Sequence, residues 1–480
     1  MDEGIVPSTN TRHGFRPTAH PGDVETAHRH GHGHGHGHGH GHTHSNSSSS
    51  IGNTDARVPW RQRRWIRAEG ESGRSGFHPV RFLRIIFRSG SPVARIVNFL
   101  WPVVPAAIAV RYALPDQHLL IFILAYLAMV PCANMIGFAG QEFARKVPHV
   151  IGVLTETTLG SLVEIVLFMV LIVRPDNSDG LAPGVDYIDV IQSAILGSIL
   201  ATMLLCLGLC FVVGGLKRNE QEFSEAVSEA GSGLLLTAGF GLAIPSVFRW
   251  SLDGAVPVEI LVNNTLHISR AMAILLMLAY IIFIFFQART HHGIFDAIFA
   301  ADEDRHADKD RGAKVKPKLT LVEAVVALVA SVALVALISI SLVDQIQSMV
   351  DDHDLSDSFV GLILVPLVEK AAEHLTAIDE AYDDRMNFAL SHVLGATLQT
   401  ALFNGPLVVL VGWGLDKNMG LDFDIFDLAM LILAIMTVGN FLRDQKSNYL
   451  EGSLCVIVYV GISVAAFYTP DNISKRGLYG

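Results

Sequence analysis

Apolar stretches of membrane-spanning length follow one another along this chain from residue 96 to residue 469. A helix needs about 20 consecutive apolar residues to cross the hydrocarbon core of a bilayer. The stretches lie at residues 96–114, 119–139, 150–173, 187–215, 229–249, 268–287, 320–343, 357–378, 387–413, 425–442 and 450–469. Only 17% of the residues are charged, against about 25% in soluble domains. We therefore predict an all-α integral membrane protein of about eleven transmembrane helices.

The segments outside these stretches differ sharply in composition. Residues 1–58 are rich in His, Gly and Ser and have no apolar period, which is typical of disorder. A histidine stands at every second position from His28 to His44, either as low-complexity sequence or as a buffer for transition metals. Residues 59–95 form an Arg-rich segment, and residues 471–480 form a short tail.

The loops carry their basic residues mainly on one side of the predicted membrane. The loops on the side of the Arg-rich segment contain Arg145, Lys146, Lys217, Arg218, Arg289, Arg385, Arg443, Lys446 and the basic residues from Arg305 to Lys318. The opposite loops contain little beyond Arg174, Arg249 and Lys417. Because cytosolic loops are enriched in Lys and Arg, we expect a cytosolic N-terminus. An odd number of helices then directs the C-terminus to a lumen or to the outside.

Two matched sequence patterns indicate an internal repeat. Gly152 precedes Glu164 by twelve positions, and Gly361 precedes Glu373 by the same twelve. In the next apolar stretches, residues 196–202 read LGSILAT and residues 394–400 read LGATLQT. The chain then divides into a first helix (96–114), a first repeat (119–287), a linker (288–318) and a second repeat (319–470). Each repeat has five helices, so the two repeats are inverted and enter the membrane in opposite orientations, as in secondary transporters whose site lies between the repeats.

The linker between the repeats mixes acidic and basic residues. It is either a solvated cytosolic connection or, less simply, a weak regulatory cation site.

Glu164 and Glu373 lie in the middle of apolar stretches. An ionised carboxylate there costs about 2.5–3.5 kcal/mol unless it faces a partner or a wet cavity. Either acid alone could simply bond a neighbouring helix, but two acids at matching repeat positions favour a cation site. Carboxylate oxygens suit calcium or another hard cation, and they take up protons when the cation leaves. The pair therefore predicts exchange of a cation for protons.

Small and polar residues surround the two acids. Gly160, Gly197 and Gly395 permit close helix approach or a local break in a helix. Pro366 interrupts the second acidic helix just before its carboxylate. Neutral oxygens on the neighbouring stretches, either ligands or helix-packing groups, come from Ser198, Thr202, Thr397 and Gln399.

No pairing of a nucleophile with a base stands out in the sequence. We therefore expect no enzyme activity and no bound cofactor. The expected partners are membrane lipid, an inorganic cation and protons, without nucleic acid.

Several motifs make the chain resemble the calcium/proton exchanger family of fungal and plant vacuoles, within the cation/calcium exchanger superfamily. They are GFAGQE at 137–142, CFVVGG at 210–215, FQARTHH at 286–292, AAEH at 371–374 and KSNYLEG at 446–452. The resemblance runs from about residue 96 to 470. It implies about eleven spans, a cation site on the paired acidic helices, a cytosolic acidic linker and calcium loading of the vacuole. Within the fourth motif, His374 directly follows Glu373 and is expected to modulate the site.

The chain departs from the family pattern, Gly-Asn followed by two residues and Glu. The first repeat has Gly160-Ser161, which replaces an amide ligand with a hydroxyl, and the second has Glu369-Lys370. An asparagine usual earlier in the first acidic helix is Glu156 here. The serine and the two additional glutamates join the candidate cation ligands.

Lys370 is the departure with the largest electrostatic consequence. Its ammonium can pair with Glu373, or it can turn aside to Glu369 and leave the site working. At about 5 Å and an effective dielectric near 20, it opposes a divalent ion by roughly 6–7 kcal/mol and a monovalent ion by about half. The two additional glutamates offset this charge and take the nominal charge of the site from −2 to −3. The lysine therefore weakens calcium binding, favours another ion, or abolishes transport.

Three functions remain open from the sequence. The leading one is a proton-coupled calcium antiporter of the vacuole or another acidic organelle. The second keeps the fold and changes the ion to sodium, potassium, manganese or zinc. The third is a non-transporting paralogue that serves as a membrane scaffold or sensor. The oligomeric state stays undetermined.

Overall fold

The computed structural model describes residues 69–469, apart from residues 71–72, 89–91, 148–154, 156–157, 175–184, 292, 295–296, 299–317 and 354. Several predictions lie outside the described residues. These are the predictions for residues 1–58 with their histidines, for most of the charged linker, for the C-terminal tail at 471–480 and for the candidate ligand Glu156.

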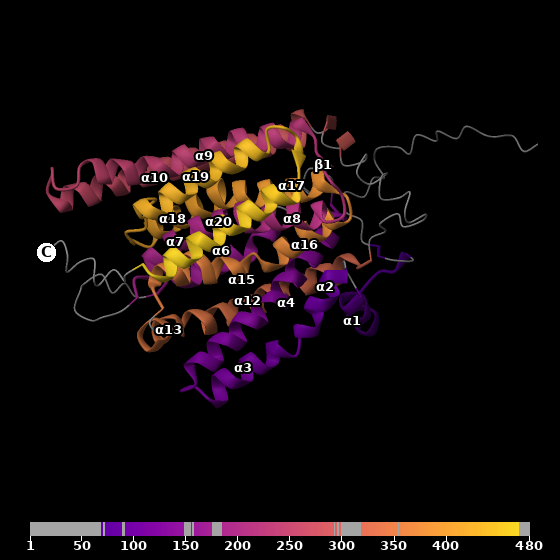
Figure 1. Cartoon of the computed structure of the whole chain (residues 1–480). Coiled ribbons are helices and arrows are strands. Elements are labelled where there is room, and N and C mark those ends of the chain that lie inside the picture. Colours follow the sequence, from indigo (N-terminus) through magenta and orange to yellow (C-terminus); the bar gives the residue numbers. More distant parts are fainter. Residues whose placement is uncertain are drawn as a thin grey trace, which may run out of the picture. The chain divides into compact units, whose positions relative to one another are not determined.

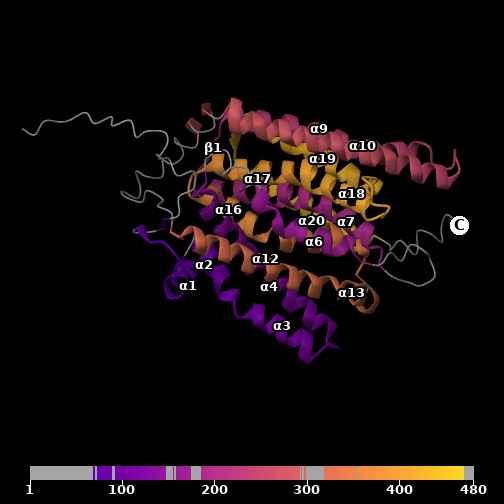
Figure 2. The same cartoon turned by 180° about the vertical axis from the view of Figure 1, so that it is seen from behind.

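Helices make up nearly all of the described chain (Figures 1 and 2). Those before the linker are α1 (Pro79–Arg88), α2 (Pro92–Val97), η3 (Asn98–Leu100), α3 (Val103–Ala113), α4 (His118–Ala144), α6 (Leu162–Ile172), α7 (Tyr187–Leu200), η4 (Ala201–Cys206), α8 (Leu207–Gly215), α9 (Glu225–Ser251), α10 (Val258–Phe285) and η5 (Phe286–Thr290). Those after it are α12 (Leu321–Val343), α13 (Ile346–His353), α14 (Asp357–Phe359), η6 (Val360–Leu364), α15 (Val365–Glu369), α16 (Ala371–Tyr382), α17 (Met386–Gln399), η7 (Thr400–Asn404), α18 (Gly405–Gly414), α19 (Ile425–Phe441) and α20 (Tyr449–Phe467).

Eight helices among the described residues are long and apolar enough to cross a membrane. They are Arg95–Ala113, His118–Ala144, Tyr187–Gly215, Glu225–Ser251, Val258–Thr290, Leu321–Asp352, Met386–Gly414 and Tyr449–Phe467. Shorter apolar helices, Leu162–Ile172 and Ile425–Phe441, fall within two further predicted spans. The all-α membrane architecture is therefore confirmed, whereas the total of about eleven spans stays a prediction.

One element was not predicted from the sequence. Strands β1 (Gln221–Glu222) and β2 (Lys446–Ser447) pair antiparallel, with Gln221 opposite Ser447. Each strand has only two residues, too few to show an alternating pattern. The pair joins the segment after α8 to the segment before α20.

The two predicted repeats share several features of architecture. Their first helices, α4 and α12, pack side by side (Figures 1 and 2). Helices α7 and α17 each contain 14 residues, and each runs directly into a π-helical turn, η4 in the first repeat and η7 in the second. Because a π turn shifts the faces of a helix and often marks a functional position, both turns lie where a site is expected.

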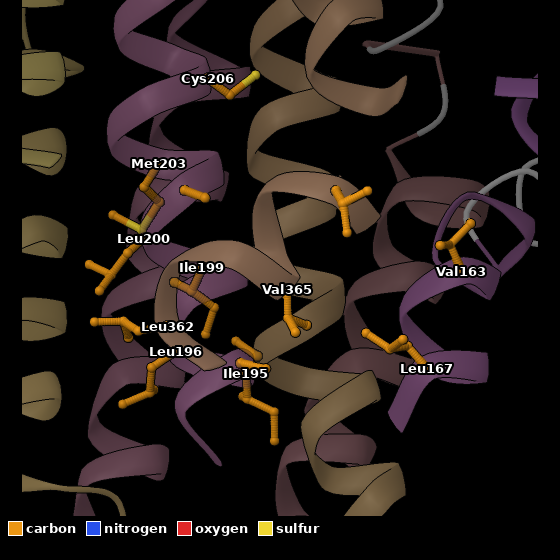
Figure 3. Close-up of a cluster of buried hydrophobic side chains, with 14 of the residues drawn as sticks. Val163, Leu167, Ile195, Leu196, Ile199, Leu200, Met203, Cys206, Leu362 and Val365 are labelled. Atoms are coloured by element: carbon orange, nitrogen blue, oxygen red, sulfur yellow. The ribbon is translucent and has the colours of Figure 1, made fainter. Parts of the chain in front are cut away.

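Helix α7 crosses the second acidic helix at very short range. A Cβ added to Gly197 would lie 2.1 Å from the carbonyl oxygen of Leu362. Pro366 has no N–H to donate to that carbonyl in the usual α-helical pattern. Buried apolar side chains of both segments surround it, among them Ile195 and Leu196 (Figure 3). Gly395 differs from the prediction, because a Cβ there would meet no atom of the described residues within 4 Å.

Glu142, in one of the resemblance motifs, holds the start of the second repeat. Its buried carboxylate accepts hydrogen bonds from the backbone N–H groups of Lys318 and Leu319 at 2.8 and 3.0 Å. Arg145 pairs with the same carboxylate at 2.8 Å. The motif therefore has a structural role at this end of the molecule.

Candidate functional site

Both acidic helices break three residues before their glutamate. Ser161 precedes α6 with φ −91° and ψ 6°, and Lys370 separates α15 from α16 with φ −93° and ψ −4°. This sparsely populated backbone region is common at functional sites. Glu164 and Glu373 then lie in the first turns of α6 and α16, where the helix dipole favours a negative charge. The two breaks are equivalent under the predicted repeat.

Glu164 is held by side chains of the second repeat. The Thr400 hydroxyl lies 3.0 Å from each carboxylate oxygen, and the Asn404 amide donates to Oε2 at 2.7 Å. Lys370 Nζ lies 2.7 Å from the same Oε2, and the glutamate side chain is only 1% exposed. The carboxylate is thus buried and fully partnered.

Glu373 has a more open environment. Its side chain is 27% exposed, and its Oε2 lies 3.4 Å from Lys370 Nζ. A Cβ added to Gly160 would lie 3.3 Å from Glu373 Oε1. The carboxylate of the second repeat therefore faces the helix break of the first.

Lys370 joins the two acids that the sequence pairs by symmetry. Its ammonium contacts both Glu164 and Glu373, while its side chain is 2% exposed. Of the two alternatives left open by the sequence, the contact with Glu373 is present. The contact with Glu164 was not anticipated, because only the fold brings the two repeats together.

Glu369 lies on the α7 side of the break. Its Oε1 accepts a hydrogen bond from the Ser198 hydroxyl, and its buried Oε2 has no hydrogen-bond partner in the part of the chain that the structure describes. Thr202 donates to the Ser198 carbonyl at 2.8 Å, and its hydroxyl lies 3.2 Å from His374 Nε2. These neutral groups connect α7 and η4 to the second acidic helix.

Of the remaining predicted ligands, one contacts the break before α6 and another bonds within its own helix. Gln399 donates from its amide to the Ser161 hydroxyl at 2.8 Å, so it contacts the first break. The Thr397 hydroxyl donates to the Val393 carbonyl of its own helix at 2.7 Å. Among the described residues, no group of three or more His, Cys, Asp or Glu side chains is arranged to hold a metal ion.

Sequence reasoning missed Thr400 and Asn404 as partners of Glu164. Both lie in the π-helical turn η7, which changes the face that a residue presents. The recurrence of threonine at positions 202 and 400 was the one available signal.

Comparison with known proteins agrees with this architecture. The family model described as "Sodium/calcium exchanger protein" matches residues 117–289 and 323–468. Over 386 residues the chain is 30% identical to vacuolar cation/proton exchanger 2 of Arabidopsis thaliana, covering 80% of this chain and 83% of that protein. It is 31% identical over 363 residues to the Ca(2+)/H(+) antiporter of Aphanothece halophytica, covering 73% and 90%.

Solved structures give the same fold. The structure of native YfkE matches with a TM-score of 0.62 and 25% identity, over 77% of this chain and all (100%) of that chain. The H+/Ca2+ exchanger CAX matches with a TM-score of 0.54 at 12% identity, over 78% and 92%. From the extent of the family match, the chain belongs to the sodium/calcium exchanger protein family.

Proposed function

We propose that this protein exchanges calcium for protons across a membrane. One observation carries the proposal: a carboxylate from each repeat, Glu164 and Glu373, contacts a single shared positive charge at 2.7 and 3.4 Å. Two acids that one cation can join form a hard-oxygen site of the kind calcium prefers. The names of the relatives, which include a vacuolar calcium ion transporter of Schizosaccharomyces pombe, support calcium as the first ion to test.

Exchange follows from competition for the same oxygens. A cation and protons neutralise the two carboxylates alternately, because a buried pair of bare acids is costly in a membrane. Rocking of one repeat against the other opens the site to each side in turn. The partly exposed Glu373 is the acid that meets the incoming ion, and the buried Glu164 fixes its inner position.

The location follows from the same chemistry. Proton-driven calcium uptake needs an acidic compartment, so we place the protein in the vacuole or a similar endomembrane with its N-terminus cytosolic and its C-terminus lumenal. The neutral donors Ser161, Ser198, Thr202 and Gln399 complete the ligand set around the acids.

Lys370 gives a specific reason to keep two other candidates. Its charge opposes a divalent ion more than a monovalent one, which favours sodium or potassium over calcium, manganese or zinc. If the ammonium never leaves, the protein is a non-transporting scaffold or sensor.

Transport into sealed vesicles tests the proposal. Reconstituted protein in vesicles with an acidic interior is expected to accumulate radioactive calcium, and a protonophore is expected to abolish the uptake. Parallel assays with sodium, potassium, manganese and zinc identify a different ion. Uptake of every ion at the level of empty vesicles would leave only the non-transporting candidate.

The hydroxyl of Thr400 provides a milder test of the site. Thr400→Val removes the donor to both Glu164 oxygens, and a hydrogen bond to a charged group is worth about 1.5–3 kcal/mol. We expect the apparent calcium affinity in the uptake assay to fall about tenfold. Thr397→Val is the matched control, because that hydroxyl bonds only within its helix and its loss should leave the affinity unchanged. Equal effects of the two substitutions would remove Thr400 from the site.

A further inference from the structure

We propose that the Lys370 ammonium is a tethered counter-cation that occupies the position of the transported ion and must leave it before that ion binds. The contacts that carry this inference are those from Nζ to Glu164 and Glu373. The inference rests on the proposed function in one respect, because it takes these two carboxylates as the ligands of the ion.

The ammonium and a calcium ion cannot be present in this position together. Calcium binds carboxylate oxygens at about 2.3–2.6 Å, and Nζ already lies 2.7 Å from Glu164 Oε2 and 3.4 Å from Glu373 Oε2. An ion that contacts these same two Oε2 atoms would therefore overlap the ammonium. Binding and occupation by the lysine are mutually exclusive.

The backbone at Lys370 is fixed, so only its side chain needs to move. Its N–H donates to the Pro366 carbonyl at 3.0 Å, and its carbonyl accepts from the His374 N–H at 2.9 Å. The flexible four-carbon stem of a lysine allows its charge to swing while the main chain stays in place.

Glu369 provides the alternative acceptor. Its Oε2 is buried without a hydrogen-bond partner among the described residues, although Oε1 is bonded to Ser198. A displaced ammonium that pairs with this oxygen stays compensated, whereas an unpaired charge in the membrane interior would be costly. The Lys370 ammonium can thus pair with the adjacent Glu369 carboxylate when the ion enters, and it can return to Glu164 and Glu373 when the ion leaves.

The first repeat shows the same break without a tether. Ser161 has nearly the same backbone conformation as Lys370, but its neutral hydroxyl accepts a hydrogen bond from Gln399. The positive charge therefore belongs to one repeat only. It neutralises the acids in the empty protein and lowers the affinity of the site for any cation, most strongly for a divalent one.

Direct binding of radioactive calcium to the purified full-length protein tests this inference. Lys370→Gln removes the charge and is expected to lower the calcium dissociation constant at least about tenfold. Lys370→Arg retains the positive charge, so its calcium dissociation constant is expected to stay within about threefold of that of the original protein. Lys146→Gln is the matched control, because Lys146 is also buried but donates a hydrogen bond to the Glu69 carbonyl. The calcium affinity of this variant should equal that of the original protein.

Lys370→Ser, which copies Ser161 of the first repeat, serves as a second variant with the same expectation. Should both neutral variants fold only in the presence of calcium, calcium has replaced the lysine and the inference stands. Binding no tighter than in the original protein, or misfolding that calcium does not rescue, would overturn it. The assay needs no transport, so an inert protein whose neutral variants bind calcium tightly would count against the proposed function alone.

Discussion

Replacing Glu373 with glutamine is expected to reduce proton-driven calcium uptake at least about a hundredfold while the protein remains folded. An amide has nearly the shape of the carboxylate, but it can neither balance a cation nor carry an exchangeable proton. Loss of a carboxylate that a buried ion needs costs several kcal/mol, and each 1.4 kcal/mol is a factor of ten. The measurement is the initial rate of calcium uptake into acidic vesicles, normalised to the amount of reconstituted protein.

Glu225→Gln is the control for this substitution, because Glu225 is an exposed carboxylate at the start of α9. Its uptake should equal that of the original protein. If Glu373→Gln retains more than about a tenth of the uptake, Glu373 does not belong to the transport site.

Gly197→Ala is expected to cause the largest loss of stability among single-methyl changes near the site. The added Cβ would lie 2.1 Å from the Leu362 oxygen and 2.7 Å from both the Leu362 carbonyl carbon and Pro366 Cγ. These are mostly backbone atoms that cannot turn away, so α7 and the second acidic helix must separate. Overpacking of this kind costs about 1–3 kcal/mol or more, and we expect a melting temperature lower by at least about 5 °C.

Gly395→Ala is a closely matched control, because Gly395 occupies the corresponding position in the second repeat and has nothing within 4 Å of an added Cβ. Its melting temperature should stay within about 2 °C of the original. Similar melting temperatures for the two alanine variants would contradict the close crossing at Gly197.

These two glycines illustrate how far the sequence alone could lead. The hydropathy pattern predicted the span at 187–215, and the structure has a helix at Tyr187–Gly215. The repeat motif identified both glycines but could not distinguish them, because the difference depends on which helix crosses each one. Helix α10 begins at Val258 rather than at 268, since its first turns contain polar residues that lower the hydropathy.

The site shows the same division between pattern and packing. Matched spacing in the two predicted repeats identified Glu164 and Glu373. An ionised carboxylate costs free energy anywhere in the membrane interior, so the position of each acid in an apolar stretch was itself a signal of a site. The partners Thr400 and Asn404 could not be identified, because the π turn η7 alters the helical face on which they lie. The position of the Lys370 ammonium likewise depends on how the two predicted repeats contact each other. The spacing of residues along one helix does not reveal that contact.

If one site carries calcium and protons in exchange, calcium entry must drive protons out of a vesicle, and this reverse coupling can be measured. Proteoliposomes with a pH-sensitive dye inside start at equal pH on both sides, with the membrane potential clamped, and calcium is then added outside. We expect the interior to become alkaline as calcium enters, and we expect vesicles with Glu373→Gln to show neither change. Calcium entry without any movement of protons would contradict exchange at one site.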